Sequence, residues 1–196
     1  MFARTERLLL RPSWPEDAQA LLQAVAEEEV IRNLAVVPWP YTAKDAHDFA
    51  EMQHPLHYPQ FLLWKRTDAA PRLVGACGIA QREGAAELGY WIARPYWGMG
   101  YASEAASAVL GVARALGHKR LVSGHFTDNP ASGKVLRKIG FRDTGKVELR
   151  ESKGRGQAVP CALYALDLVG DAASESDRDA PTGVMRPKPE RHQIAA

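Results

Sequence analysis

The sequence predicts an α/β domain with a mixed, largely antiparallel sheet flanked by helices. Three β-type runs follow one another with short turn-like segments between them, at residues 61–66, 72–80 and 86–93. This spacing is typical of successive antiparallel strands. A long helical pattern, residues 102–116, comes directly after the third run. Strands and helices combined in this way indicate an α/β domain.

The N-terminal quarter is expected to add one strand and two helices. Residues 8–11 form a predicted short strand. A capping box of Ser13 with Glu16 is expected to start a helix that ends near the acidic run Glu27–Glu29. A second, weaker helix is expected from Thr42 to about Met52.

The C-terminal half begins with the long helix, whose apolar stripe is rich in alanine and stops at Gly117. Small side chains let a helix approach a sheet closely. The elements expected after it are a strand at 119–126, a short helix at 131–138, and a strand pair at 142–150 and 158–168. We expect residues 1–170 to form one domain. Residues 171–196 carry few large apolar side chains and are expected to form a flexible C-terminal tail.

Composition excludes several classes of protein. The 196 residues include 25 Lys and Arg against 23 Asp and Glu, which argues against a nucleic-acid partner. No apolar run approaches the ~20 residues that cross a bilayer, and the start lacks a secretory signal, so a cytoplasmic protein without a membrane partner is expected. Cys77 and Cys161 are expected to be buried reduced thiols.

The most informative segment is residues 90–102, in which a strand, two glycines and the start of the long helix follow one another. Gly98 and Gly100 let main-chain N–H groups approach a phosphate, and the helix N-terminus favours negative charge there. The segment lacks the Gly-Lys-Ser/Thr of a P-loop and the spacing of a dinucleotide fingerprint. The alternative is a plain glycine-rich turn without a ligand.

The motif from Trp97 to Ala105, WGMGYASEA, resembles the acetyl-CoA diphosphate loop of the GNAT superfamily of N-acetyltransferases, in the version of the RimJ/RimL-type ribosomal-protein alanine acetyltransferases. In the family pattern Gln/Arg-x-x-Gly-x-Gly/Ala, this chain has Trp97, Gly100 and Ala102, and the Trp is usual for that subgroup. Two further motifs match in the family's order, residues 87–92 and 128–141. The resemblance covers about residues 4–168.

The resemblance implies a GNAT-type fold and an enzyme that moves an acetyl group from acetyl-CoA to a primary amine. Main-chain N–H groups of the loop would hold the diphosphate, and the open edge of the preceding strand would pair with the pantetheine arm. One N–H of that strand would polarise the thioester carbonyl. The expected donor-binding residues are Trp91, Ile92, Ala93, Trp97, Gly98, Met99, Gly100, Tyr101, Ala102, Ser103, Asn129 and Ser132.

Glu87 is the predicted general base, because a carboxylate in a central apolar strand costs free energy unless it has a task or a partner. It would take the amine proton directly or through water. The alternative is a salt-bridged or edge-exposed glutamate. Ser132 is the second predicted catalytic residue, near the sulfur. Many relatives have a Tyr as general acid where this chain has Leu136, so protonation of the thiolate would fall to Ser132, to water or to no group. Asn129 and Ser132 have the alternative of merely capping their helix.

The histidines do not predict a metal site, because His54 and His57 lack a nearby Cys or ordered carboxylate at ligand spacing. His125 is a reserve candidate for the base or for a contact with the substrate. The aromatic segments 39–41 and 57–59 are expected either to line the acceptor entrance or to pack in the core.

The predicted acceptor is the N-terminal amine of a protein or peptide. A small amine such as a polyamine or aminoglycoside is the enzymatic alternative, and a catalytically silent acyl-CoA-binding module is the other. A narrow acidic pocket using Glu27–Glu29 would favour the polyamine. The sequence leaves a homodimer open.

Overall fold

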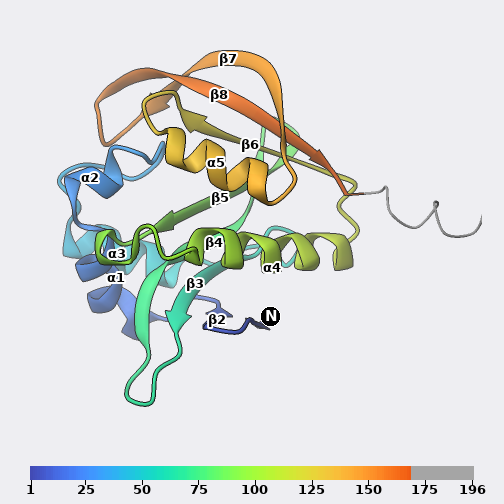
Figure 1. Cartoon of the computed structure of the whole chain (residues 1–196). Helices are drawn as coiled ribbons and strands as arrows, with labels where there is room; N and C mark the ends of the chain where they lie inside the picture. Colours follow the sequence, from blue (N-terminus) through green and yellow to red (C-terminus); the bar gives the residue numbers. More distant parts are fainter. Residues whose placement is uncertain (169–196) are drawn as a thin grey trace, which may run out of the picture.

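An eight-stranded mixed sheet forms the centre of the protein (Figure 1). The computed structural model describes residues 1–168. The predicted boundary at residue 170 and the predicted tail, residues 171–196, lie outside the described residues. The strands are β1 (Ala3–Arg4), β2 (Leu8–Arg11), β3 (Gln60–Lys65), β4 (Arg72–Arg82), β5 (Ala85–Ile92), β6 (Arg120–Phe126), β7 (Arg142–Ser152) and β8 (Gln157–Asp167).

The strand order is β1-β2-β3-β4-β5-β6-β8-β7. Neighbouring strands are antiparallel except β5 and β6, which are parallel because α4 connects them across one face. The expected mixed, largely antiparallel sheet flanked by helices is confirmed. The helical elements are η1 (Pro15–Asp17), α1 (Ala18–Val25), α2 (Glu28–Ile31), α3 (Ala43–Glu51), η2 (Arg94–Tyr96), α4 (Tyr101–Ala115) and α5 (Pro130–Lys138).

The helices cover both faces of the sheet. Ala105 and Val109 of α4 and Leu136 of α5 share one core cluster with Leu88 of β5, and Figure 1 shows both helices in front of the sheet. A second cluster joins α1 and α3 to the opposite face, with Leu21 among its members. In the first cluster, Ala105, Ala106 and Ala113 of α4 are fully buried, which is the close approach that small side chains allow.

Side chains of β5 alternate between these two faces. Leu88, Tyr90 and Ile92 belong to or pack against the α4–α5 cluster, whereas Trp91 and Ala93 contact the α1–α3 cluster. By the same alternation, Glu87 lies on the α1–α3 face. One strand therefore presents different residues to the two sides of the sheet.

The start of the first helix differs from the prediction. η1 begins at Pro15, and the side chain of Asp17 accepts from the Trp14 N–H at 2.8 Å. Asp17 is buried and pairs with Arg11 of β2 at 2.7 Å. The capping box therefore joins Trp14 and Asp17, one residue later than predicted. The predicted capping box of Ser13 with Glu16 was wrong. The expected end of this helix near the acidic run is confirmed, because α1 ends at Val25. Part of the run, Glu28 and Glu29, begins the separate short helix α2.

Other local predictions are confirmed. Thr42 and Asp45 form the capping box that opens α3. Cys77 and Cys161 are buried and unpaired thiols. Burial raises the pKa of the Cys77 thiol, which keeps it protonated and unreactive. Within residues 1–168, every helix is too short or too polar to cross a bilayer.

Candidate functional site

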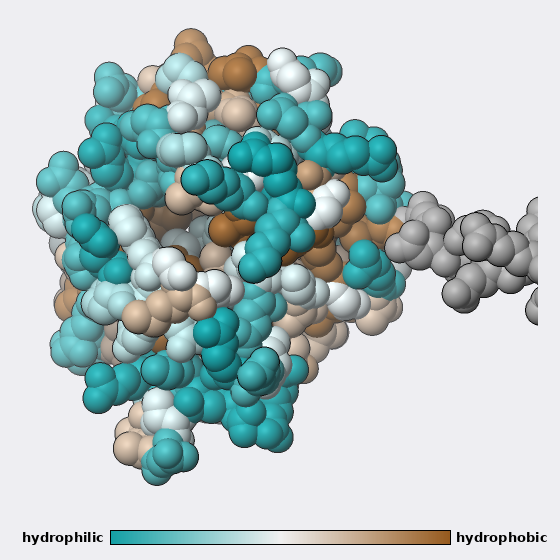
Figure 2. All heavy atoms as spheres, in the orientation of Figure 1, coloured by the Kyte–Doolittle hydropathy of each residue, from teal (hydrophilic) through white to brown (hydrophobic). Residues whose placement is uncertain are grey.

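The candidate site lies where the neighbouring strands β5 and β6 part. Within the described residues the two strands pair at one position, Glu87 with Val122, and the Ser123 hydroxyl donates to the Leu88 carbonyl at 2.9 Å. Both strands continue beyond these contacts, so an extended ligand has a strand edge to pair with. Figure 2 shows a hollow on this face, where Figure 1 places the end of β5 between α5 and the loop before α4.

Successive residues of β5 direct their main-chain N–H and C=O groups alternately toward β4 and toward β6. The Ala93 N–H donates to the Val74 carbonyl of β4 at 2.9 Å, so the amide of Trp91 also faces β4. Ile92 faces the opening, and its carbonyl accepts from Trp97 Nε1 at 2.6 Å. Ile92 can therefore contact a ligand in the opening through its main chain. The N–H groups of Trp91 and Ala93 face β4 instead, so the predicted main-chain contact does not fit these two residues.

A glycine-rich loop joins β5 to α4. Gly98 has a φ of 75° and Gly100 a φ of 82°, in the left-handed region that glycine adopts without strain. Nothing lies within 4 Å of the position that a Cβ on Gly98 would take. α4 is 15 residues long, and the N–H groups of its first turn carry partial positive charge. The loop therefore has the geometry of an anion site.

The other predicted loop residues fall into two groups. Trp97 and Met99 are exposed beside the loop. Ala102 and Ser103 lie in the first turn of α4 and are half-buried. Tyr101 is only 3% exposed and belongs to the core, so it can meet a ligand through its main chain alone.

Ser132 contacts a residue that the sequence analysis missed. The Tyr90 hydroxyl lies 2.8 Å from Ser132 Oγ and 3.0 Å from the Ser132 carbonyl oxygen, to which it can donate. Burial raises the pKa of Tyr90, so the phenol stays protonated. The alternation of side chains along β5 could have placed Tyr90 on the same face as α5. The contact with Ser132 itself depends on how α5 packs against the sheet, which the sequence does not show.

The start of α5 has a local role as well. Asn129 Oδ1 accepts from the Ser132 N–H at 3.4 Å, which is the capping interaction that the sequence offered as an alternative. Its contact with a ligand stays a prediction. Leu136 is fully buried in the core. Its side chain is apolar, so no general acid stands at that position.

Glu87 lies in an ion-pair cluster on the α1–α3 face. Its carboxylate accepts from Arg150 Nη1 at 2.5 Å and lies 3.6 Å from Arg82 Nε. Arg150 also contacts Glu148 at 3.1 Å. Glu87 thus has the salt-bridged environment named as its alternative, and its action as a base stays a prediction.

The histidines are divided among separate contacts. His125 Nδ1 lies 2.8 Å from the Phe126 carbonyl oxygen, and its ring fills the space that a Cβ on Gly133 would need. His54 packs against Phe49, with ring centroids 6.3 Å apart. Within residues 1–168, no group of three or more His, Cys, Asp or Glu is arranged to hold a metal ion.

The segment 57–59 does not line the opening. The rings of His57 and His118 lie 4.1 Å apart, and Tyr58 lines a cavity with Ala85 and Arg120, at the far ends of β5 and β6. Of the two alternatives for this segment, core packing is the one that the structure supports, since Tyr58 packs against the α4–α5 cluster. Tyr41 of the other aromatic segment packs near Trp91, and burial raises its pKa to about 12.

Arginines pair with two carboxylates near the C-terminal ends of β5 and β6, Glu29 and Asp128. Glu29 pairs with Arg94 at 2.6 Å, and Asp128 pairs with Arg155 at 2.7 Å. Arg32 lies 3.4 Å from the same Asp128 carboxylate. The hydrogen bond from Arg155 holds the pKa of Asp128 below its ordinary value. The narrow acidic pocket that would favour a polyamine is not formed by Glu29, whose charge is already paired.

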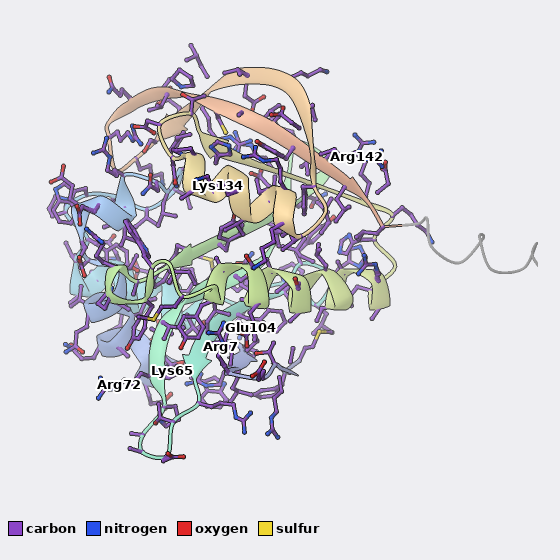
Figure 3. The ribbon with its side chains drawn as sticks, in the orientation of Figure 1. Arg7, Lys65, Arg72, Glu104, Lys134 and Arg142 are labelled. Atoms are coloured by element: carbon purple, nitrogen blue, oxygen red, sulfur yellow. The ribbon has the colours of Figure 1, made fainter. Side chains whose placement is uncertain are left out.

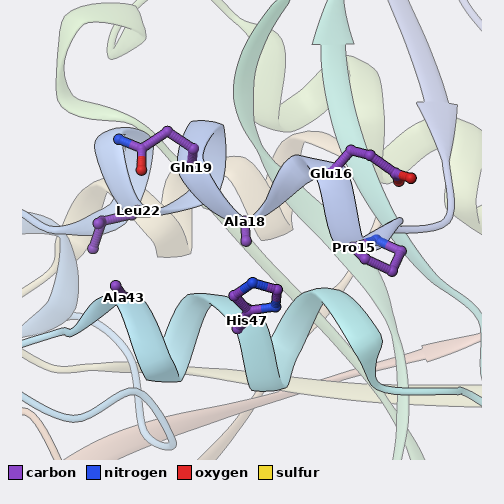
Figure 4. Close-up of a pocket in the computed structure, with 7 residues that line it drawn as sticks. All are labelled: Pro15, Glu16, Ala18, Gln19, Leu22, Ala43 and His47. Carbon is purple, nitrogen blue, oxygen red and sulfur yellow. The ribbon is translucent and has the colours of Figure 1, made fainter.

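Another cavity, of about 220 Å³, lies away from the opening, between α1 and α3 (Figure 4). Its lining residues are Pro15, Glu16, Ala18, Gln19, Leu22, Ala43 and His47. None of these residues belongs to the loop, to β5 or to α5, so this cavity is separate from the candidate site.

Comparison with known proteins gives a consistent result. A family model described as an acetyltransferase (GNAT) domain matches residues 7–142. The uncharacterized N-acetyltransferase p20 of Bacillus licheniformis is 30% identical over 171 residues, which span 83% of this chain and 93% of the relative.

Solved structures share the fold. An acetyltransferase of the GNAT family from Bacillus anthracis superposes with a TM-score of 0.74 at 24% identity, over 86% of this chain and 99% of that one. RimL, a ribosomal L7/L12 alpha-N-protein acetyltransferase in complex with coenzyme A, has a TM-score of 0.71 at 20% identity, over 85% of this chain and 98% of its own.

Proposed function

This chain belongs to the GNAT family of acetyl-CoA-dependent N-acetyltransferases, and we propose that it acetylates the N-terminal amine of a protein or peptide. The observation that carries the proposal is the parting of β5 and β6 beside the glycine loop of α4. An extended donor and an acceptor can meet in this opening from opposite faces of the sheet.

The donor, acetyl-CoA, fits the α4–α5 side of the opening. The free N–H groups between Gly98 and Ser103 hold its diphosphate, as a helix N-terminus with a glycine loop does for other phosphates. Ile92 pairs with the pantetheine arm, because its main chain faces the opening. Another N–H of the same strand would donate to the thioester carbonyl oxygen.

Glu87 receives the proton of the attacking amine from the other face, directly or through one water. The amine nitrogen bonds to the acetyl carbon, and the carbon–sulfur bond breaks. Arg150 and Arg82 contact the Glu87 carboxylate. The same guanidinium groups fix its position in the strand.

Ser132 supplies a proton to the departing thiolate on the α4–α5 face. Tyr90 supports this step, since its protonated hydroxyl lies 2.8 Å from Ser132 Oγ and can replace the proton that Ser132 gives up. The pair thus performs the task of the acidic Tyr that Leu136 replaces. Acid and base groups then lie on opposite faces of β5, where the leaving thiol and the arriving amine need them.

The acceptor side favours a chain terminus over a polyamine. A polycation requires several uncompensated carboxylates, but Glu29 and Asp128 each pair with an arginine, which leaves only Glu27 and Glu28 of the acidic run. A chain terminus brings one amine and main-chain groups that need no such cluster. The fold-level similarity to RimL, which is named as an alpha-N-protein acetyltransferase, agrees with this choice.

A thiol-release assay tests the proposal. Purified protein is incubated with acetyl-CoA and a panel of N-terminal peptides and small amines, and free thiol is measured. Release with peptides is expected. Release with polyamines alone would favour the small-molecule alternative, and binding of acetyl-CoA without release from any acceptor would favour a silent binding module.

A further inference from the structure

Glu104 lies in the first turn of α4, beside the proposed diphosphate site. An ionised carboxylate at this position repels a diphosphate unless a cation neutralises it. Its side chain is only 16% exposed. It accepts from the Thr5 hydroxyl at 2.5 Å and from the Arg7 N–H at 2.9 Å, which ties the β1–β2 turn to α4.

Arg7 completes this arrangement with its guanidinium group. Arg7 Nε and Nη2 donate to Glu104 Oε2 at 2.7 Å and 2.6 Å, and Figure 3 shows the two labelled side chains next to each other beside α4. Burial opposes ionisation of Glu104, but the hydrogen bonds from Thr5 and Arg7 outweigh it and lower its pKa. The pair is therefore an ionised, neutralised unit.

Arg7 also contacts the glycine loop directly. Its Nη1 donates to the Met99 carbonyl at 3.0 Å, and its guanidinium lies 4.4 Å from the centre of the Tyr101 ring. A carbonyl oxygen that pointed toward a phosphate would repel it. The hydrogen bond from Arg7 holds the Met99 carbonyl oxygen toward Arg7. The N–H groups of the loop then remain available to an anion.

We propose that Arg7 and Glu104 are positioning residues for the donor: the pair fixes the main chain between Met99 and Glu104 in its anion-binding conformation, and Arg7 cancels the Glu104 charge that would repel the diphosphate. This inference rests on the proposed use of acetyl-CoA. Neither residue contacts the reacting atoms in this scheme, so the pair acts through the loop.

The test compares two donors that differ in the diphosphate. Arg7→Met is expected to weaken coenzyme A binding about tenfold by titration calorimetry. Its kcat/KM is expected to fall by a similar factor with acetyl-CoA, but by less than about twofold with S-acetylpantetheine, which lacks the diphosphate. The exposed Arg4 on β1 provides the control, because Arg4→Met removes a nearby positive charge without touching the loop.

A double variant separates charge from packing. Arg7→Met leaves the Glu104 charge uncompensated, so Arg7→Met with Glu104→Gln is expected to regain part of the lost affinity. Unchanged coenzyme A binding in Arg7→Met, or an equal loss with both donors, would overturn the inference. Failure of the unaltered protein to bind coenzyme A would instead refute the proposed function.

Arg7→Lys is the second variant if Arg7→Met does not fold. Lysine keeps the positive charge but lacks the planar fork that contacts Glu104 and Met99 together. Its coenzyme A affinity is expected to be severalfold weaker than that of Arg4→Lys. Equal affinities of these two variants would contradict the positioning role.

Discussion

The proposed donor side and the proposed acceptor side of β5 are built from different kinds of groups. On the donor side, the loop offers main-chain N–H groups at Gly98 and Gly100 and at the start of α4. On the acceptor side, the groups are side chains in ion pairs, such as Glu87 with Arg150 and Asp128 with Arg155. The first set is contiguous in the chain, whereas the second joins residues far apart in sequence.

The two kinds of groups suit two different tasks, which are binding of a constant donor and selection of an acceptor. A diphosphate is the same in every acetyl-CoA, so a main-chain cradle whose shape depends on two glycines is sufficient. An acceptor is selected by charge and shape, which side chains provide. Substitutions on the two sides should therefore affect different steps of the reaction.

The largest effect is expected at Glu87. Glu87→Gln keeps the shape but removes the proton acceptor, so kcat should fall about 100-fold while the coenzyme A dissociation constant stays unchanged. Glu148→Gln is the matched control, because Glu148 shares Arg150 but is more exposed. Steady-state kinetics across a range of pH measures both. Full turnover of Glu87→Gln at every pH would show that Glu87 is not the base.

The next effect is expected on the donor side, at Gly100. Its φ of 82° costs an L-residue about 1–2 kcal/mol, so Gly100→Ala should distort the loop and weaken coenzyme A binding roughly tenfold. Gly111→Ala in the same helix has ordinary φ and open space, and should bind coenzyme A normally. Equal affinities in calorimetry would argue that the loop conformation does not determine binding.

A smaller effect is expected at the Tyr90–Ser132 pair. Ser132→Ala and Tyr90→Phe should each lower kcat about fivefold at saturating acetyl-CoA, because thiolate protonation is assisted but coenzyme A thiol leaves slowly unaided. The double variant should be little worse than either single variant if the two hydroxyls act together. Tyr58→Phe, at the far ends of β5 and β6, is the control. Independent, multiplicative losses would contradict a shared proton path.

The contrast between the two sides also explains what the sequence could predict. The loop motif is local: the strand, the glycines and α4 are contiguous, so their order already indicates an anion site. Most strands and α3 to α5 were likewise predictable within two residues from periodicity and turn residues. The predictable part of the site is thus the part made by the main chain.

Tertiary contacts account for the remainder. The partner of Ser132 is Tyr90, 42 positions away, and Glu87 meets Arg150, 63 positions away. Nothing in either local pattern specifies such a partner. The capping carboxylate of the first helix is Asp17 and not the predicted Glu16 for the same reason, because Asp17 pairs with Arg11 on β2.

The smallest effect is expected on stability, at the acceptor side. Asp128 has its pKa lowered by Arg155 in the folded state, so the pair stabilises the fold at pH values above the ordinary carboxyl pKa of 3.8 and this contribution is lost as pH falls below it. Because Asp128 is 44% exposed, the contribution is limited to about 1 kcal/mol. Asp128→Asn should lower the free energy of unfolding by that amount at pH 7, with a difference that shrinks below pH 4. Urea unfolding at both pH values measures it. Asp167→Asn is the control, because Asp167 at the end of β8 pairs with Arg120 at the start of β6, at 3.2 Å. A constant difference across this pH range would show that the Asp128 carboxylate contributes through packing and not through its charge.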